Sequence, residues 1–285
     1  MVMTRYPSWL TAGVLAASAL FASAHVAAQA QAGASAALDA AIAGAHRSPA
    51  NTARDRYRHP RETLEFFGLR PDMTVVEIWP GPGWYTEILA PLLHERGKLY
   101  AAHYGSRQSF AYQGRELEGF SAKVASTPSI YGRVMVTRFG FPDELEIAPA
   151  ASADLVVTFR NVHNWFQEGY GPPNAADLAF GAIFAALKPG GVLGVVDHRW
   201  PDPATEDRAA RNGYISEQRV IEHAEAAGFE LAGRSEVNRN PLDRHDHPEG
   251  VWTLPPDLAL GARARDKYVA IGESDRFTLK FVTPD

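Results

Sequence analysis

The chain has 285 residues, of which 46% are hydrophobic, so it can bury a full core and its length suits one α/β domain better than two. Its formal net charge is -5 and it has no long basic run, so nothing favours nucleic acid as a partner. It contains no cysteine, which excludes disulfides, a cysteine nucleophile, thiolate metal sites and a lipid-modified cysteine.

The first thirty residues have the features of an export signal. Arg5 supplies a positive start, residues 9–22 are apolar but short for a bilayer span, and residues 28–30 form an A-x-A cleavage site. An earlier A-x-A at residues 22–24 and an uncleaved membrane anchor are the alternatives. We expect cleavage after Ala30, which would place the protein in a periplasm or the medium, without a stable membrane anchor.

The next segment leads into the folded domain. Residues 31–50 are rich in alanine and predict a flexible lead followed by a short helix. The densest basic cluster of the chain comes next, at residues 54–61, and on general grounds it is a solvated surface. The alternative is that this segment folds over the mouth of a sheet and brings an anionic ligand group close to Arg56, Arg58 or His59.

Residues 74–93, TVVEIWPGPGWYTEILAPLL, predict a strand, a glycine turn and a helix. The first six residues are apolar except for Glu77, which is typical of a strand buried on both faces. The PGPG run at residues 80–83 allows a sharp reversal, and apolar residues then return at helical spacing. In an open α/β sheet such a turn lies at the carboxyl end of the strand, where ligands bind. Glu77 is therefore a candidate ligand contact.

Strands and helices alternate over the rest of the chain. After a short helix at residues 62–67 and the first strand, we expect strands at residues 99–102, 134–137, 154–159, 192–196, 229–233 and 277–282. Helices are expected at residues 113–124, 175–187 and 217–227. This order predicts an α/β domain over residues 51–285, with a doubly wound, mostly parallel sheet covered by helices on both faces.

Four segments of the chain, in this order, have the features of known motifs: VVEIWPGPGWYTEIL, DLVVTFRNVHNW, LKPGGVLGVVDHR and EAAGFEL. In that order, and at these separations, they resemble the class I S-adenosylmethionine-dependent methyltransferases, and more closely a group of exported bacterial proteins described as predicted methyltransferases. The resemblance runs from Ala50 to the C-terminus. It implies a Rossmann-like sheet of seven strands whose last strand is antiparallel, with S-adenosyl-L-methionine across the ends of the first, second and fourth strands.

The resemblance also implies a cofactor site, although this chain differs from the usual family motifs at three places. Trp79 stands where the family usually has the first glycine of its first motif, and His103 replaces the acid that usually ends the second strand. Residues 139–141 occupy a region that often has an adenine-binding aspartate. The cofactor site implied by the resemblance consists of Glu77, Trp79, Pro80, Gly81, Gly83, His103 and Arg160.

Polar side chains cluster just after the fourth and fifth predicted strands, where this fold binds its ligands. Methyl transfer needs positioning, exclusion of water and a base where the acceptor carries a proton. We therefore propose His163 and His198 as catalytic bases, Asn161 and Asp197 as groups that orient the acceptor, and Trp165 as a wall of the pocket. The alternative is that the two histidines only hold neighbouring loops in place.

The late loop at residues 238–252 contains Asp243, His245, Asp246 and His247. Imidazole and carboxylate groups suit zinc or a similar ion, but their spacing matches neither a helical metalloprotease pair nor an EF-hand. We favour a polar lid over the acceptor side and predict no metal ligands.

The predicted function is an exported S-adenosylmethionine-dependent methyltransferase that acts on a small molecule. The alternative is a binding protein, or a repurposed fold, that uses the same cleft without methyl transfer. A Trp79 ring that fills the methionine site would favour the alternative, whereas an open cavity that reaches Glu77 would favour the enzyme. A nicotinamide-dependent oxidoreductase is less favoured, because the full G-x-G-x-x-G is missing and no acid ends the second strand.

Overall fold

The computed structural model describes residue 29 and residues 32–285. Apart from position 29, the expected export signal at residues 1–30 lies outside the described residues. Within the part of the chain that is described, none of the helices combines the length and the hydropathy that crossing a bilayer requires.

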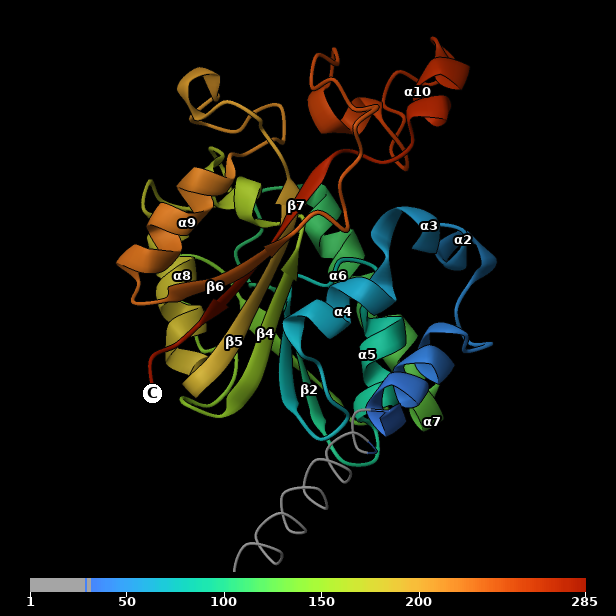
Figure 1. The fold of residues 1–285 in the computed structure, drawn as a ribbon, viewed down its shortest axis with the longest axis vertical. Coiled ribbons are helices and arrows are strands. Elements are labelled where there is room, and N and C mark those ends of the chain that lie inside the picture. Colours follow the sequence, from blue (N-terminus) through green and yellow to red (C-terminus); the bar gives the residue numbers. More distant parts are fainter. Residues whose placement is uncertain (1–28, 30–31) are drawn as a thin grey trace, which may run out of the picture.

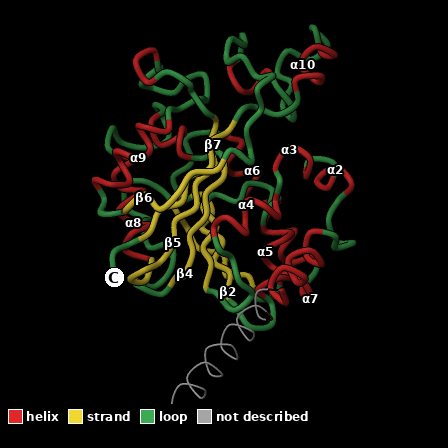
Figure 2. Tube along the Cα trace, in the orientation of Figure 1, coloured by secondary structure: helices red, strands yellow, loops and turns green. Residues whose placement is uncertain are grey.

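A seven-stranded sheet forms the centre of the molecule (Figures 1 and 2). Its order is β3-β2-β1-β4-β5-β7-β6, and every neighbouring pair is parallel except those that β7 makes with β5 and β6. The strands are β1 (Thr74–Ile78), β2 (Lys98–Tyr104), β3 (Val134–Phe139), β4 (Ala153–Phe159), β5 (Leu187–His198), β6 (Glu230–Ser235) and β7 (Arg276–Val282). The predicted doubly wound fold with an antiparallel last strand is confirmed. The strand order reverses between β1 and β4, which is the position where this architecture binds ligands.

Helices pack against both faces of the sheet. The α-helices are α2 (Pro49–Thr52), α3 (Asp55–Arg58), α4 (Pro60–Phe67), α5 (Thr86–Leu93), α6 (Ala111–Ser126), α7 (Pro128–Tyr131), α8 (Ala175–Ala186), α9 (Glu217–Ala226) and α10 (Arg265–Ile271). Short 3-10 helices are η1 (Val162–Phe166), η2 (Pro203–Thr205) and η3 (Gly250–Thr253).

Two hydrophobic cores lie on the two faces. The first core contains Phe180 of α8 and Val220 of α9. The second core contains Phe67 of α4 and Ile88 of α5. Figure 1 shows α8 and α9 on one side of the strands, and α4 and α5 on the other. Because β-strand side chains alternate between faces, neighbouring residues of β1 contribute to different cores: Val75 belongs to the second and Val76 to the first.

The lead segment contains the expected helix, but the helix begins earlier than predicted. Residues 32–42 are helical, and Leu38 and Ala41 are buried in the same core as Phe67. The packed body therefore begins well before residue 51. Small alanine-rich segments give a weak amphipathic signal, and here two apolar side chains suffice to dock the helix.

The fifth strand is longer than predicted at both ends. We expected a helix through Leu187 and a strand over 192–196, but β5 runs from Leu187 to His198. A register shift against β4 accommodates the LKPGG sequence, as bulges do for proline and glycine in strands. At the other end, pairing of His198 with Arg276 extends the strand. Asp197 and His198 are thus held by the sheet itself and not by a loop.

A long connection between β6 and β7 rises above the sheet. Figure 1 shows this segment, which includes α10, beyond the end at which β7 begins. That end is also where β1, β4 and β5 finish, because β7 runs antiparallel to β5. The connection therefore covers the edge of the sheet that carries the glycine turn.

Candidate functional site

The turn after β1 uses backbone conformations that favour glycine. Gly81 and Gly83 have φ of +55° and +84°, and a Cβ on Gly83 would lie 3.2 Å from the Phe120 ring. Trp79 also has a positive φ, of +41°, at the position where the resembling family has its first glycine. A left-handed backbone costs a bulky residue about 1 to 3 kcal/mol. The surrounding packing must therefore hold Trp79 in this conformation.

That packing is an aromatic cluster. Trp79 is 5% exposed, and its indole N–H donates a hydrogen bond to the backbone oxygen of Phe139, at 2.9 Å. The rings whose centroids lie within 6.4 Å of the Trp79 ring are those of Tyr104, Phe139, Phe141, Trp165 and Tyr170. The indole thus packs beside the ends of β2 and β3 and against η1, which follows β4.

A cavity of about 510 Å³ opens at the carboxyl ends of β1 and β4. Its size falls in the range of small-molecule sites. Its lining includes Glu77 and residues 79–82 of the glycine turn, residues 159–161 and 163–164 after β4, and residues 251–252 of the long connection. The cavity reaches Glu77, and Trp79 belongs to its lining while the indole packs in the aromatic cluster.

Glu77 is buried, and this changes its acidity. It is 2% exposed, and its Oε2 accepts a hydrogen bond from the Thr86 hydroxyl at 2.6 Å. Burial raises the pKa of Glu77 to about 7, although the Thr86 hydrogen bond and Lys123 act in the opposite direction. Near neutral pH the side chain can exist as a carboxyl or as a carboxylate, and a cationic ligand group would favour the carboxylate.

His163, Asp197 and His198 form a compact group beside the cavity. Asp197 accepts hydrogen bonds from His163 Nδ1 at 2.8 Å, from the His163 backbone N–H at 3.0 Å and from the His198 backbone N–H at 2.7 Å. His198 Nδ1 shares a hydrogen bond of 2.5 Å with the Ser274 hydroxyl. Both histidines line the cavity, whereas Asp197 is fully buried behind them.

This arrangement suits a general base. Because an ionised carboxylate only accepts, His163 donates its Nδ1 proton to Asp197 and keeps Nε2 for a proton acceptor role. Neither histidine Nε2 has a hydrogen-bond partner among the described residues. Burial, followed by repulsion from His163 and Arg160, lowers the pKa of His198 well below its ordinary value. A neutral His198 is therefore available near neutral pH.

The same three side chains have the spacing of a metal site. One ligand atom from each of His163, Asp197 and His198 lies within 4.8 Å of the others. However, both Asp197 oxygens already accept protein hydrogen bonds, and Arg58, Arg160 and Arg276 all act on His198 as positive charges. This charge opposes a bound cation, so the group is better suited to proton transfer than to metal binding.

Basic side chains line another part of the cavity. Arg54 and Arg58, from the segment around α3, reach the lining together with Arg160 at the end of β4. Glu273 lies among them, with its oxygens 2.6 Å from Arg54 Nε and 3.4 Å from Arg58 Nε. Arg56 is exposed and contacts the Tyr57 ring. The basic segment thus divides between the cavity and the solvent, and it is Arg54 and Arg58 that face a ligand.

Three predicted site residues do not line the cavity: Gly83, His103 and Asp197. His103 Nε2 instead donates to the backbone oxygen of Gly81 at 3.0 Å, and its Nδ1 accepts from the Tyr104 N–H at 2.9 Å. Burial lowers the pKa of His103 to about 4, which keeps it neutral. The expected direct contact of His103 with a cofactor is not supported, and His103 positions the glycine turn.

Asn161 also supports that turn. Its amide nitrogen donates to the backbone oxygen of Ile78 at 2.9 Å, and it lines the cavity. Trp165, predicted as a wall, is 2% exposed and lies in the aromatic core beside Trp79, outside the cavity lining. The acceptor-orienting role of Asn161 stays a prediction, now combined with a structural one.

Sequence reasoning missed an acidic and aromatic wall from α6. Tyr112 and Glu116 line the cavity, and Phe120 is buried one turn further on. Glu116 Oε2 accepts a hydrogen bond from the Tyr104 hydroxyl at 3.2 Å. The spacing of four residues placed these side chains on one helix face, and that signal was available in the sequence.

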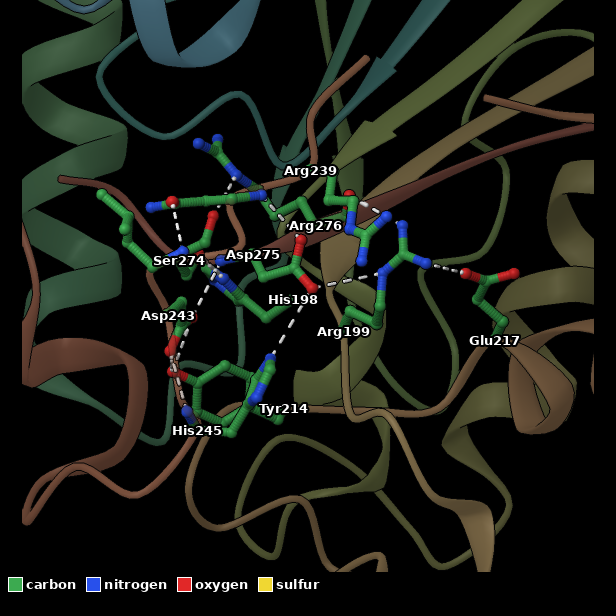
Figure 3. A network of polar contacts seen from close by, with 12 residues as sticks. His198, Arg199, Tyr214, Glu217, Arg239, Asp243, His245, Ser274, Asp275 and Arg276 are labelled. Carbon is green, nitrogen blue, oxygen red and sulfur yellow. Dashed lines mark hydrogen bonds and ion pairs between the residues drawn. The ribbon is translucent and has the colours of Figure 1, made fainter. Parts of the chain in front are cut away.

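The late loop is held by a buried polar network (Figure 3). Asp243 accepts hydrogen bonds from the Tyr214 hydroxyl at 3.0 Å, from His247 Nε2 at 2.9 Å and from the Asp275 N–H at 2.8 Å. These bonds tie the loop to the start of β7, and Trp252 from the same loop lines the cavity. The loop therefore contributes to the cavity wall, its role as a lid stays a prediction, and its Asp243 and His247 are hydrogen-bonded to each other.

The comparisons with known proteins support the fold. No protein-family model matches the chain, and no curated protein does. Among solved structures, it is similar to a SAM-dependent methyltransferase from Aquifex aeolicus, with 18% identity over 82% of this chain and 93% of the other and a TM-score of 0.51. It is also similar to the [4+2]-cyclase SpnF, with 17% identity over 80% of each chain and a TM-score of 0.52. The chain thus has the class I methyltransferase fold.

Proposed function

We propose that this protein is an S-adenosylmethionine-dependent methyltransferase that acts on a small molecule. The observation that carries this proposal is the cavity at the reversal point of a class I methyltransferase sheet, which reaches the buried acid of the first motif and places two histidines on its wall. Fold alone does not decide activity, so the proposal depends on this site.

The residues present fit an adenosyl cofactor. Gly81 has a positive φ and leaves space that a Cβ would occupy 3.6 Å from Glu116 Oε2. Glu77 offers a carboxylate for the ammonium group of the methionine part, and Glu116 can accept hydrogen bonds from ribose hydroxyls. Trp79 and Tyr112 offer apolar faces for the adenine ring. The bound cofactor would supply an electrophilic methyl group on sulfur.

The chain's own contribution is positioning and proton transfer. His163, oriented by Asp197, would accept the proton of the methyl acceptor at Nε2, and His198 stands beside it with a ring-centroid separation of 5.1 Å. Trp252, from the loop above the site, would help to exclude water. The methyl acceptor binds between these side chains and the glycine turn.

We further propose that the protein is exported. The basis is the sequence of residues 1–30, with its apolar stretch and A-x-A site. Determination of the N-terminus of the protein recovered from a periplasmic fraction tests this, and a chain that keeps Met1 in the cytoplasm would contradict it.

Calorimetric titration with S-adenosylmethionine and S-adenosylhomocysteine tests the enzyme. We expect binding in the micromolar range, and binding about tenfold weaker for Glu77→Gln, which corresponds to the loss of a charge-assisted hydrogen bond. The matched control is Glu118→Gln on the exposed side of α6, which should bind as the unchanged protein does. Absence of heat with both compounds would refute the proposal.

A second candidate is a ligand-binding protein or an enzyme of another class with this fold. Two observations favour it: Trp79 at the first glycine position and His103 in place of the acid that usually contacts ribose. The similarity to a cyclase shows that the fold also serves other reactions. The same titration separates the two candidates, because only the methyltransferase must bind the adenosyl compounds.

A further inference from the structure

The basic wall of the cavity holds more positive charge than its protein partners neutralise. Four guanidinium groups, from Arg54, Arg58, Arg160 and Arg276, act electrostatically on Glu273. Burial raises the pKa of Glu273, but these arginines outweigh it and hold the pKa below its ordinary value. Among the described residues, Glu273 is the one acid that forms ion pairs with Arg54, Arg58 and Arg276, and Arg58 and Arg276 are 4% and 3% exposed.

Several donors of this wall have no acceptor. Arg54 Nη2 and Arg58 Nη2 are fully buried and make no hydrogen bond to any described residue. The Arg160 side chain makes no ion pair within the described part of the chain, although it lines the cavity. Buried polar groups without partners are costly, so this wall keeps positive charge that no described acceptor neutralises, and Arg160 is the arginine free to meet an anion from the cavity.

The acids of the cavity do not supply that acceptor. Glu77 is hydrogen-bonded to Thr86, and Glu116 to Tyr104. Asp257, the third acid of the lining, forms no ion pair with a described residue. Although Arg160 acts as a positive charge on Glu116, none of the three acids forms an ion pair with Arg54, Arg58 or Arg160. A zwitterionic amino-acid tail with a sulfonium brings one carboxylate but two positive charges, so the proposed cofactor alone would leave the cavity more positive.

We propose that Arg58 and Arg160 bind an anionic group, a carboxylate or a phosphate, of the molecule that accepts the methyl group. This inference rests on the proposed function. Both arginines act as positive charges on His198, which places the anion site next to the candidate bases. An acceptor held there by its charged group would present its nucleophilic atom to His163 or His198. Planar guanidinium groups recognise both carboxylate and phosphate through paired N–H bonds.

Arg160 is the informative position for a test. It is half-buried and has no carboxylate partner in the described chain, so its removal leaves no unpaired acid behind. Arg58 is less suitable, because Glu273 would lose one of its cations. The matched control is Arg107, an exposed arginine paired with Asp143 away from the cavity lining.

The experiment is isothermal titration of the purified protein with inorganic phosphate and, separately, with succinate, each with and without saturating S-adenosylhomocysteine. We expect one anion to bind without displacing S-adenosylhomocysteine, about tenfold more weakly to Arg160→Gln and unchanged to Arg107→Gln. Arg160→Lys should recover part of the loss. The anion that binds more tightly identifies the group, and unchanged thermal melting of Arg160→Gln excludes misfolding.

Each contrary result has a separate meaning. An anion that competes with S-adenosylhomocysteine would assign these arginines to the cofactor and overturn the inference. The inference also fails if S-adenosylhomocysteine binds but neither anion does, or if Arg160→Gln has no effect, and the proposed function survives both results. If an anion binds in an Arg160-dependent way but S-adenosylhomocysteine does not, the methyltransferase and the acceptor role are both refuted.

Discussion

Replacement of Glu77 by glutamine should remove a pH dependence of stability that this one side chain creates. Glu77 is 2% exposed at the end of β1, and burial raises its pKa from an ordinary value of 4.5 to about 7. The Gln side chain has nearly the same shape and can still accept the Thr86 hydrogen bond, but it cannot ionise.

Proton linkage sets the sign and the size of this pH dependence. Between pH 4.5 and about 7, the folded protein keeps a proton on Glu77 that the unfolded chain has lost, so the free energy of unfolding falls as the pH rises. At about 1.4 kcal/mol for each pH unit, this interval corresponds to a loss of about 3 kcal/mol. The Gln variant has no such loss. Its stability relative to the unchanged protein should therefore increase by about 3 kcal/mol across the interval.

Urea unfolding at a series of pH values from about 4 to about 8 measures the difference. The control is Glu118→Gln, because Glu118 is exposed on α6 and makes no hydrogen bond or ion pair to the described residues. The control should differ from the unchanged protein by a constant amount. A constant difference for Glu77→Gln as well would refute the argument that burial controls this acid.

Ionisation of Glu77 should also affect ligand binding. If Glu77 accepts hydrogen bonds from a ligand ammonium group, the carboxylate form binds better, and S-adenosylhomocysteine should bind more tightly as the pH rises through about 7. Glu77→Gln should lack this dependence. A pH-independent affinity in the unchanged protein would separate Glu77 from the ligand.

Three further predictions concern side chains around the site. Trp79→Ala should lower the free energy of unfolding in urea by about 3 to 5 kcal/mol, because a buried ring leaves a cavity; a loss below about 1 kcal/mol would contradict this packing. Asp197→Ala should cost about 3 kcal/mol or more in the same assay, since three N–H donors lose their acceptor, and an unaffected midpoint would disprove it. Tyr214→Phe should speed amide hydrogen exchange of Asp275, whose N–H donates to the same Asp243 that Tyr214 contacts; unchanged exchange would show that the network does not hold the loop.

The sheet could be predicted because its signals are local. Strands β1 and β4 are short apolar runs between turn residues, and the glycine turn after β1 follows directly from PGPG at residues 80–83. The ends of the strands were harder to predict. His198 belongs to β5 because Arg276, far along the chain, pairs with it, and no local pattern contains that information.

The part of the site that follows predicted strands could be predicted from the same local signals. Glu77 and His163 follow predicted strands, so their presence at one edge of the sheet could be anticipated. Arg54 reaches the cavity only because the segment around α3 packs against Glu273, which is 219 residues away. The cofactor contact predicted for His103 rested on its place at a strand end, which does not give the direction of a side chain. Its ring turns to the backbone of Gly81.

Two residues of the cavity lining have a left-handed backbone conformation. Trp79 and Arg160 both have positive φ, of +41° and +64°, and they follow the adjacent strands β1 and β4. Each would cost less as glycine, by about 1 to 3 kcal/mol. Both side chains line the cavity at the reversal point of the sheet. The indole is held by its hydrogen bond to Phe139, and the Arg160 backbone by the hydrogen bond that its N–H donates to the Val196 oxygen at 2.7 Å. The Arg160 guanidinium has no ion pair in the described chain, so it is available for the anionic group proposed above.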